Sequence, residues 1–359
     1  MLNSANKKYW WGLPALLLIL GGFIFLQQQY SQAASNSSQQ KIHKIIIAVP
    51  DLTASKNNSS GNLVVDHILL NRLFEKQFKA QHIEVEWRFF KGAGPAINEA
   101  LVNKQADLAF VGDLAAIIGK ANGIDTRLLA ATGRHFEAYL GVIPHQNYTR
   151  LEQLKGKRIA IWQGTAVQLS FDRFLHSQGF SEKDFKIVNL DSSAMNAALA
   201  AKQIDAGWGL MSILALQHKG LVDIPFGSQN TPNHAGSAQS GLIARQEFID
   251  QDPQVTQQIV DVLTQATQWV AQPSHREEAI MQAVKNAGYP LALYQQYLKD
   301  QDLGVLFSPL LDEEYLTYLQ SGADVAFSSK LIKKQVNVRA WAEQRFIQSS
   351  TQKFAATGP

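Results

Sequence analysis

The segment AINEALVNKQAD (residues 96–107) recurs as AMNAALAAKQID (residues 194–205), with A, N, A, L, K, Q and D at matching places. Each copy has apolar residues at helical spacing. Each is followed by a short apolar strand, LAFVG or AGWGL, and preceded by a strand and a turn of small residues. Either copy alone would suit an ordinary helix–turn–strand unit. Because the flanking segments match as well, the repeat predicts two similarly built α/β lobes.

The segments around the repeat alternate between strand and helix. Short β-branched runs such as KIIIAVP (residues 44–50), RIAIWQ (158–163) and FKIVNL (185–190) are typical of strands buried in a parallel sheet. Helical periodicity separates them, and it dominates after residue 246. This alternation predicts an α/β fold of two lobes with mixed, mainly parallel sheets and a hinge between the lobes.

The N-terminus has the pattern of an export signal. Lys7 and Lys8 precede an apolar run over residues 13–26, and small and polar residues follow at 31–35. The run is shorter than the roughly 20 residues of a comfortable membrane-spanning helix. We therefore expect a cleaved signal peptide over residues 1–34 and a location outside the cytoplasm. An uncleaved anchor is the alternative.

The lobes are expected to share the rest of the chain unequally. A linker over residues 35–43 leads to a first lobe of residues 44–138 and 236–359, and residues 139–235 form the second lobe. We place the first crossover near Arg134, after the run LLAATG, and the second in the polar loop TPNHAGSAQSG (residues 231–241).

Composition excludes several classes of function. The chain of 359 residues has no cysteine, so disulfides, thiolate metal sites and thiol nucleophiles are impossible. A formal net charge of +3 without a basic stripe argues against nucleic acid as a partner. No pair of histidines has metal-ligand spacing, and no catalytic motif is present. We expect no enzyme activity, no catalytic residue, no metal and no cofactor.

Loops that lead from a strand into a helix are the candidate binding site. In open parallel sheets, ligands bind beyond the carboxyl ends of the strands. There, unpaired N–H groups and the helix dipole favour an anion, and glycine allows close approach. Capping of the helix is the alternative role for each side chain. The candidates are Ser60, Gly61, Gly94, Gly112, Asp113, Gly164, Thr165 and Ser192.

Two larger side chains complete the candidate site. Arg134, near the expected crossover, offers a bidentate guanidinium for an acidic group, although a hinge salt bridge with Glu137 is the alternative. Trp208 could stack on the organic part of a ligand or lie in the core. Asp113 could bind an amine if it does not cap a helix.

Three segments resemble the solute-binding proteins of ABC importers for nitrate, sulfonates and taurine. They are FFKGAGPAINEALVNKQADLAFVGDLAAIIGKANG (residues 89–123), LEQLKGKRIAIWQGTAVQLSFDRFLHSQGF (151–180) and MNAALAAKQIDAGWGL (195–210). The resemblance implies a two-lobed periplasmic-binding-protein fold of type II that closes over a small ligand. The loop DLTASKNNSSGN (51–62) and the strand end GWGLMS (207–212) depart from the family's pattern.

The function that this resemblance implies is capture of a small organic anion, foremost an aliphatic sulfonate. We expect a periplasmic monomer whose partners are the ligand and an ABC permease in the inner membrane. Nitrate or a pyrimidine precursor of thiamine are alternative ligands. A thiamine-pyrimidine synthase of the same fold and a membrane-anchored sensor domain are alternative functions.

Overall fold

The structure, a computed structural model, describes residues 41–53 and 57–355. The expected signal peptide, most of the linker and residues 54–56 of the loop 51–62 lie outside the described residues. The chain divides after Ile42 into two units, and the fold below is that of the second, His43–Pro359. No helix in the described ranges is both long and apolar enough to cross a membrane.

Two five-stranded sheets organise this unit. The first has the order β2-β1-β3-β10-β4, in which β10 alone runs antiparallel to its neighbours. The second has the order β7-β6-β8-β5-β9, and here β5 is the antiparallel strand. The predicted α/β class and the mixed, mainly parallel sheets are therefore confirmed. The strands are β1 (Lys44–Pro50), β2 (Glu84–Phe90), β3 (Leu108–Gly112), β4 (Thr126–Phe136), β5 (Tyr139–Val142), β6 (Arg158–Ile161), β7 (Lys186–Asn189), β8 (Ala206–Gly209), β9 (Asp223–Gly227) and β10 (Ala238–Arg245).

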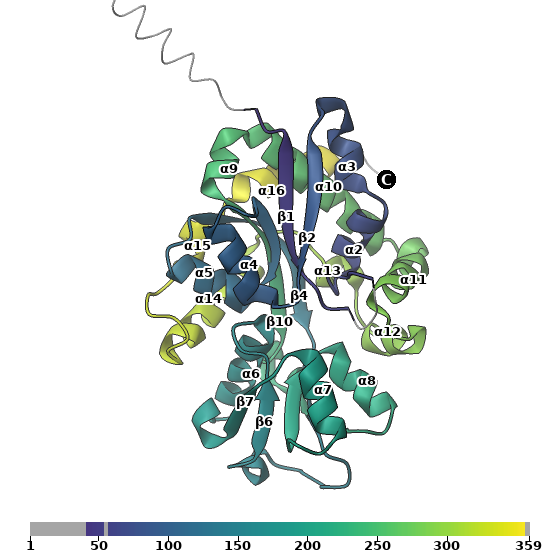
Figure 1. Cartoon of the computed structure of the whole chain (residues 1–359), viewed down its shortest axis with the longest axis vertical. Helices are drawn as coiled ribbons and strands as arrows, with labels where there is room; N and C mark the ends of the chain where they lie inside the picture. The colour runs from purple at the N-terminus through teal and green to yellow at the C-terminus, as the bar shows by residue number, and fades with distance from the viewer. Residues whose placement is uncertain (1–40, 54–56, 356–359) are drawn as a thin grey trace, which may run out of the picture. The chain divides into compact units, whose positions relative to one another are not determined.

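Helices flank both sheets, and Figure 1 shows the first sheet with its helices above the second. We call these two bodies the first and second lobes. The first-lobe helices before the crossover are α2 (Leu63–Leu70), α3 (Leu73–Phe78), α4 (Ala93–Val102) and α5 (Asp113–Ala121). Those of the second lobe are α6 (Ala166–Ser177), α7 (Ser192–Ala200) and α8 (Met211–His218). The C-terminal helices are α9 (Gln246–Gln251), α10 (Pro253–Ala271), α11 (Arg276–Ala287), α12 (Leu291–Tyr297), α13 (Leu303–Leu306), α14 (Glu313–Ser328), α15 (Val338–Trp341) and α16 (Gln344–Ala355).

The sequence repeat marks equivalent places in the two lobes. Asp107 and Asp205 precede β3 and β8, and each carboxylate accepts a backbone N–H of the neighbouring strand at 2.8 Å, from Ile46 and Arg158 respectively. Lys104 and Lys202 both take positive φ angles, 54° and 57°. The same residues thus end the helix and align the next strand in both copies, which confirms the prediction of two similarly built lobes.

The chain passes between the lobes twice. It leaves the first sheet after β4 and enters the second at β5, and it returns from β9 to β10. The residue bounds expected for the lobes, 44–138 with 236–359 and 139–235, stay a prediction.

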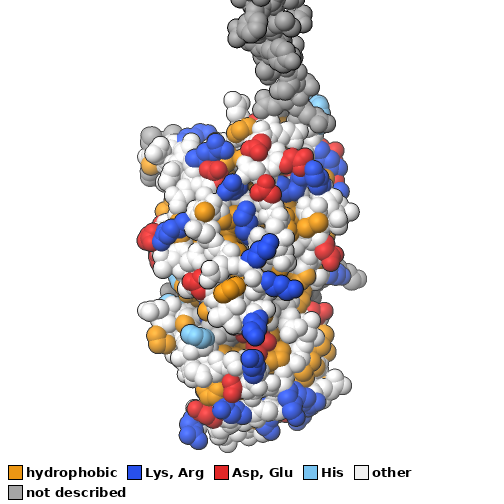
Figure 2. Space-filling model, turned by 90° about the vertical axis from the view of Figure 1, so that its left-hand side faces the viewer, with side chains coloured by type: hydrophobic (Ala, Val, Ile, Leu, Met, Phe, Trp, Pro, Cys, Tyr) orange, Lys and Arg blue, Asp and Glu red, His pale blue; other side chains and the backbone are white. Residues whose placement is uncertain are grey.

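On the face drawn in Figure 2, charged side chains of both signs are interspersed with hydrophobic ones.

Candidate functional site

A cavity of about 780 Å³ lies between the two lobes. The first lobe lines it with the carboxyl ends of β1 and β3, the start of α2, and β10. The second lobe contributes the starts of α6, α7 and α8, and the segment from Gly288 to Phe307 closes one side. The lobes touch beside it, because α8 contacts α12 and α5 contacts α6. This is the place that the carboxyl-end rule for α/β sheets predicts.

Helix N-termini from both lobes face the cavity. The first backbone N–H groups of a helix have no partner within it and carry the positive end of its dipole. At α2, Asn62 Oδ1 accepts from Val64 and Val65, and at α7, Asp191 accepts from Ala194 at 2.8 Å. No side chain caps α6 or α8. Their N-termini therefore keep the most donor capacity for a bound anion.

The charged side chains at the cavity nearly cancel. Among the described lining residues, Lys91 and Lys219 are opposed by Asp51 and Asp191. The cavity therefore offers a ligand oriented backbone N–H groups and neutral donors, and little net charge.

Four of the predicted site residues line the cavity: Ser60, Gly61, Gly112 and Ser192. Ser60 has a structural role as well, because its hydroxyl donates to Asp66 Oδ1 at 2.6 Å and its N–H to the same oxygen at 2.8 Å. Ser192 lies in the first turn of α7, and its hydroxyl has no hydrogen-bond partner within the described ranges. Their contact with a ligand stays a prediction.

Three predicted residues lie beside the cavity, where the lobes meet. A Cβ atom added at Gly94 would lie 3.2 Å from the carbonyl oxygen of Gly164, so the two lobes approach each other closely there. Gly164 has a φ of 74°, which favours glycine. The Thr165 hydroxyl donates to the Trp162 carbonyl at 2.7 Å, which positions Trp162 in the cavity wall.

Trp208 is not at the cavity, contrary to expectation. It is fully buried in the second-lobe core, where its ring stacks on Phe174 at 4.7 Å between centroids. Its indole Nε1 donates to Ser170 Oγ at 2.9 Å. The side chain packs against α6, so Trp208 is a core residue and does not stack on a ligand.

Asp113 also lies away from the cavity, in a buried ion pair. Its Oδ2 is 3.5 Å from Arg173 Nη1, and its Oδ1 accepts the Leu114 N–H at 2.7 Å. Burial raises the pKa of Asp113 to about 6, although the positive charge of Arg173 opposes the shift. Because α5 belongs to the first lobe and α6 to the second, this pair joins the lobes.

Arg134 forms a salt bridge, but with Asp312 at 2.9 Å and not with Glu137. Its guanidinium also donates to the carbonyls of Ser308 and Leu310. The side chain is 4% exposed. These bonds occupy the guanidinium and hold the segment before α14 against β4. Arg134 therefore does not face a ligand in this structure.

Replacement of Arg134 separates these two roles. We expect Arg134→Met to lower the free energy of unfolding by about 1–3 kcal/mol, because the partly buried carbonyls of Ser308 and Leu310 and the Asp312 carboxylate lose their donor. The affinity of the folded protein for its ligand should stay the same. Thermal unfolding and calorimetric titration measure the two quantities. A large loss of affinity at unchanged stability would show instead that Arg134 binds the acidic group of the ligand.

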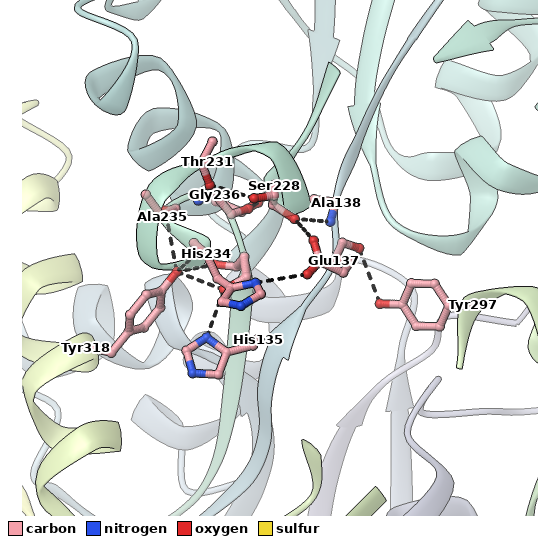
Figure 3. A network of polar contacts seen from close by, with 12 residues as sticks. His135, Glu137, Ala138, Ser228, Thr231, His234, Ala235, Gly236, Tyr297 and Tyr318 are labelled. Carbon is pink, nitrogen blue, oxygen red and sulfur yellow. Dashed lines mark hydrogen bonds and ion pairs between the residues drawn. The ribbon is translucent and has the colours of Figure 1, made fainter. Parts of the chain in front are cut away.

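Glu137 lies in the first crossover, between β4 and β5, and its contacts differ from the predicted pair with Arg134 (Figure 3). Its carboxylate accepts from the Ser228 hydroxyl and lies 3.2 Å from His234 Nδ1, and its carbonyl accepts from Tyr297 at 3.3 Å. Ser228 and His234 belong to the return segment between β9 and β10. Both crossovers are thus tied together at Glu137.

The neighbouring His135 extends this hinge network toward α14 (Figure 3). His135 Nδ1 lies 3.3 Å from Ser237 Oγ, and Nε2 lies 3.2 Å from Glu314 Oε1. Burial lowers the pKa of His135. The Tyr318 hydroxyl, with one proton to donate, lies 2.9 Å from the His234 carbonyl oxygen and 3.0 Å from that of Ser237. The network defines where the two lobes are hinged.

Gln239 is a site residue that sequence reasoning missed. It lies on β10, lines the cavity and is 1% exposed. Both polar atoms of its side-chain amide are buried without a hydrogen-bond partner in the described part of the chain. Such a group costs roughly 1–3 kcal/mol until a partner is supplied. In the sequence it stands in a polar run, TPNHAGSAQSG (residues 231–241), and nothing there separates it from loop residues.

No group of three or more His, Cys, Asp or Glu side chains that could hold a metal ion occurs in residues 41–53 and 57–355.

Comparison with known proteins identifies a family and a relative that is named as a binding protein. Residues 77–276 match the NMT1/THI5-like family. A putative aliphatic sulfonates-binding protein of Bacillus subtilis is 24% identical over 300 residues, which cover 79% of this chain and 84% of the relative. The family match and this relative agree with the family resemblance that the sequence shows.

Solved structures agree in fold. A putative periplasmic sulfonate-binding protein of Methylobacillus flagellatus is 28% identical, with a TM-score of 0.76 over 88% of this chain and 96% of that one. The desulfurization enzyme DSZB shares the fold alone, at 15% identity and a TM-score of 0.63 over 87% and 99% of the two chains. The predicted periplasmic-binding-protein fold is confirmed.

Proposed function

Because this chain belongs to the NMT1/THI5-like family and has the periplasmic-binding-protein fold, we propose that it captures a small organic anion for an ABC importer. The observation that carries this proposal is the convergence of helix N-termini from both lobes on one cavity. The uncapped starts of α6 and α8 point to an anionic ligand.

Capture follows from the way the site is divided between the lobes. The N–H groups of α6, α7 and α8 belong to the second lobe, whereas Asn62, Gly112 and Gln239 belong to the first. Only a closed arrangement brings both sets to one ligand, so ligand binding favours closure by the difference in its affinity for the two states. The closed state is then the one that a permease in the inner membrane recognises.

The anionic group that we propose is a sulfonate. Its three oxygens accept several donors at once, and it stays charged at any physiological pH. The helix starts and the serine hydroxyls of Ser192 and Ser212 supply such donors at the cavity. The names of the relatives point to the same class. Ser60, Gly61, Gly112 and Ser192 remain our proposed contacts.

We propose that the protein acts as a carrier and not as an enzyme. The chain has no cysteine to serve as a nucleophile. At the cavity, His218 is the one histidine among the described lining residues, and it is exposed at the end of α8. We further propose that residues 1–34 direct export and that the protein works as a monomer in the periplasm.

A thermal-shift panel tests the ligand class. Sulfonates are expected to raise the unfolding temperature, because a ligand that binds only the folded state stabilises it by mass action. Nitrate and a hydroxymethylpyrimidine are the competing ligands, and matched chloride and sulfate salts control for ionic strength. Stabilisation by the pyrimidine alone would overturn the sulfonate assignment.

A further inference from the structure

One side of the cavity is aromatic and apolar. It is built mainly by α12 and the turn before it, which lie beyond the residues that match the family. The lining side chains there are Phe136, Tyr289, Leu293, Tyr294, Tyr297 and Phe307. This wall has far more apolar surface than the anionic group of a ligand can use.

The aromatic wall is held in place by its own contacts. The rings of Phe136 and Phe307 meet edge to face with centroids 5.8 Å apart. The Tyr297 hydroxyl donates to the Glu137 carbonyl at 3.3 Å, and the Tyr139 ring packs edge-on against it at 6.4 Å. Leu293 and Tyr294 are 1% and 2% exposed. The wall is therefore preformed, and a ligand does not have to order it.

Helix α8 of the second lobe lies opposite this wall and contacts α12. Its cavity-facing side offers Met211, Ala215 and Leu216. The start of the same helix supplies the uncapped N–H groups. One helix thus places an anion site at its beginning and an apolar surface one to two turns further on.

The size of the cavity fits a ligand with a large organic part. Its 780 Å³ lies in the range of roughly 300–1,000 Å³ found for sites of drug-sized molecules. Nitrate or a two-carbon sulfonate would leave most of this apolar space to water. Burial of apolar ligand surface there contributes to affinity in proportion to its area.

We propose that the ligand is an organic acid with a bulky apolar group, either an aryl group or an alkyl chain of medium length. The acidic group lies at the starts of α6 and α8, and the apolar group lies between α8 and the aromatic wall of α12. This inference rests on the proposed function and narrows its substrate class.

Calorimetric titration with a chain-length series measures the apolar part directly. The series runs from ethanesulfonate through butanesulfonate and hexanesulfonate to octanesulfonate, with naphthalene-2-sulfonate as the aryl probe. We expect affinity to rise about four-fold for each buried CH₂. Equal or falling affinity along the series would overturn the inference but keep the proposed function. Failure of every sulfonate to bind would overturn the proposed function itself.

A variant at Ala215 locates the apolar group. This half-buried residue lines the cavity from α8, so Ala215→Trp fills the space beside α12. We expect at least a ten-fold loss of affinity for octanesulfonate and naphthalene-2-sulfonate and less than a two-fold change for ethanesulfonate. Gln217→Trp is the control, since Gln217 is exposed on the same helix and does not line the cavity. Equal losses for short and long ligands, with the unfolding temperature unchanged, would place the apolar group elsewhere.

Discussion

Replacement of Arg173 by methionine is expected to lower the free energy of unfolding by about 3–5 kcal/mol, as for other buried ion pairs that lose one partner. The Arg173 and Asp113 side chains are 5% and 0% exposed and lie 3.5 Å apart. The guanidinium also lies over the Tyr318 ring at 4.0 Å and donates to the Tyr318 carbonyl at 2.6 Å. Methionine keeps much of the volume but leaves the carboxyl group of Asp113 without its cation.

The cost of this replacement should depend on pH. In the folded protein the pKa of Asp113 is raised to about 6 from an ordinary value of 3.8. The folded state therefore binds the proton more tightly than the unfolded state, and stability falls as the pH rises between these two values. Without Arg173 the folded pKa rises further, so the loss of stability continues above pH 6.

Urea unfolding of wild type and Arg173→Met at pH 5 and pH 8 measures this dependence. We expect the variant to be destabilised more at pH 8 than at pH 5. The double variant Asp113→Leu/Arg173→Met is the control, and it should recover much of the loss because no buried charge remains. Equal destabilisation at both pH values, or no recovery in the double variant, would contradict an ion pair between the lobes.

Introduction of a side chain at Gly112 is expected to weaken ligand binding at least ten-fold. A Cβ atom at Gly112 would lie 2.7 Å from the Ala166 Cβ in the opposite lobe, which is closer than such atoms approach. The φ angle of −69° is one that any residue adopts, so the backbone tolerates the change. Gly112→Val should therefore wedge α6 away from β3, and Gly112→Ala should have a smaller effect.

Calorimetric titration and thermal unfolding of the Gly112 variants test this wedge. Gly92→Ala is a suitable control, because its new Cβ atom would meet only Ala96 of the same helix, at 3.0 Å. The control should bind ligand as the wild type does. If Gly112→Val binds with unchanged affinity, closure of the two lobes at this contact is not needed for capture.

The fold could be predicted from the sequence because local signals repeat. In each copy of the repeat, a lysine in the left-handed conformation ends the helix, and an aspartate binds the backbone of the next strand. Both features depend on residues within the copy and one neighbouring strand. The starts of α2, α5 and α7 were predictable from the small and polar residues between each strand and its helix. Of the residues predicted there, Ser60, Gly112 and Ser192 do line the cavity.

The rest of the site depends on packing between distant segments. Trp208 shares one face of β8 with Ala206, and the other face has only Gly207 and Gly209. The sequence does not say whether the tryptophan face meets the core or a ligand, and the stacking with Phe174 decides it. Arg134 meets Asp312 across 178 positions of the chain. The aromatic wall of α12 comes from a region that shows only helical periodicity. No sequence pattern indicates that these segments meet at the cavity.

Calorimetric titration of octanesulfonate into the wild type and Gly112→Val tests capture between the lobes most directly. Saturable binding of one ligand per chain is expected for the wild type, with at least a ten-fold weaker affinity in the variant. The absence of saturable binding to the folded wild type, or equal affinity in both proteins, would contradict capture of an anion between the lobes.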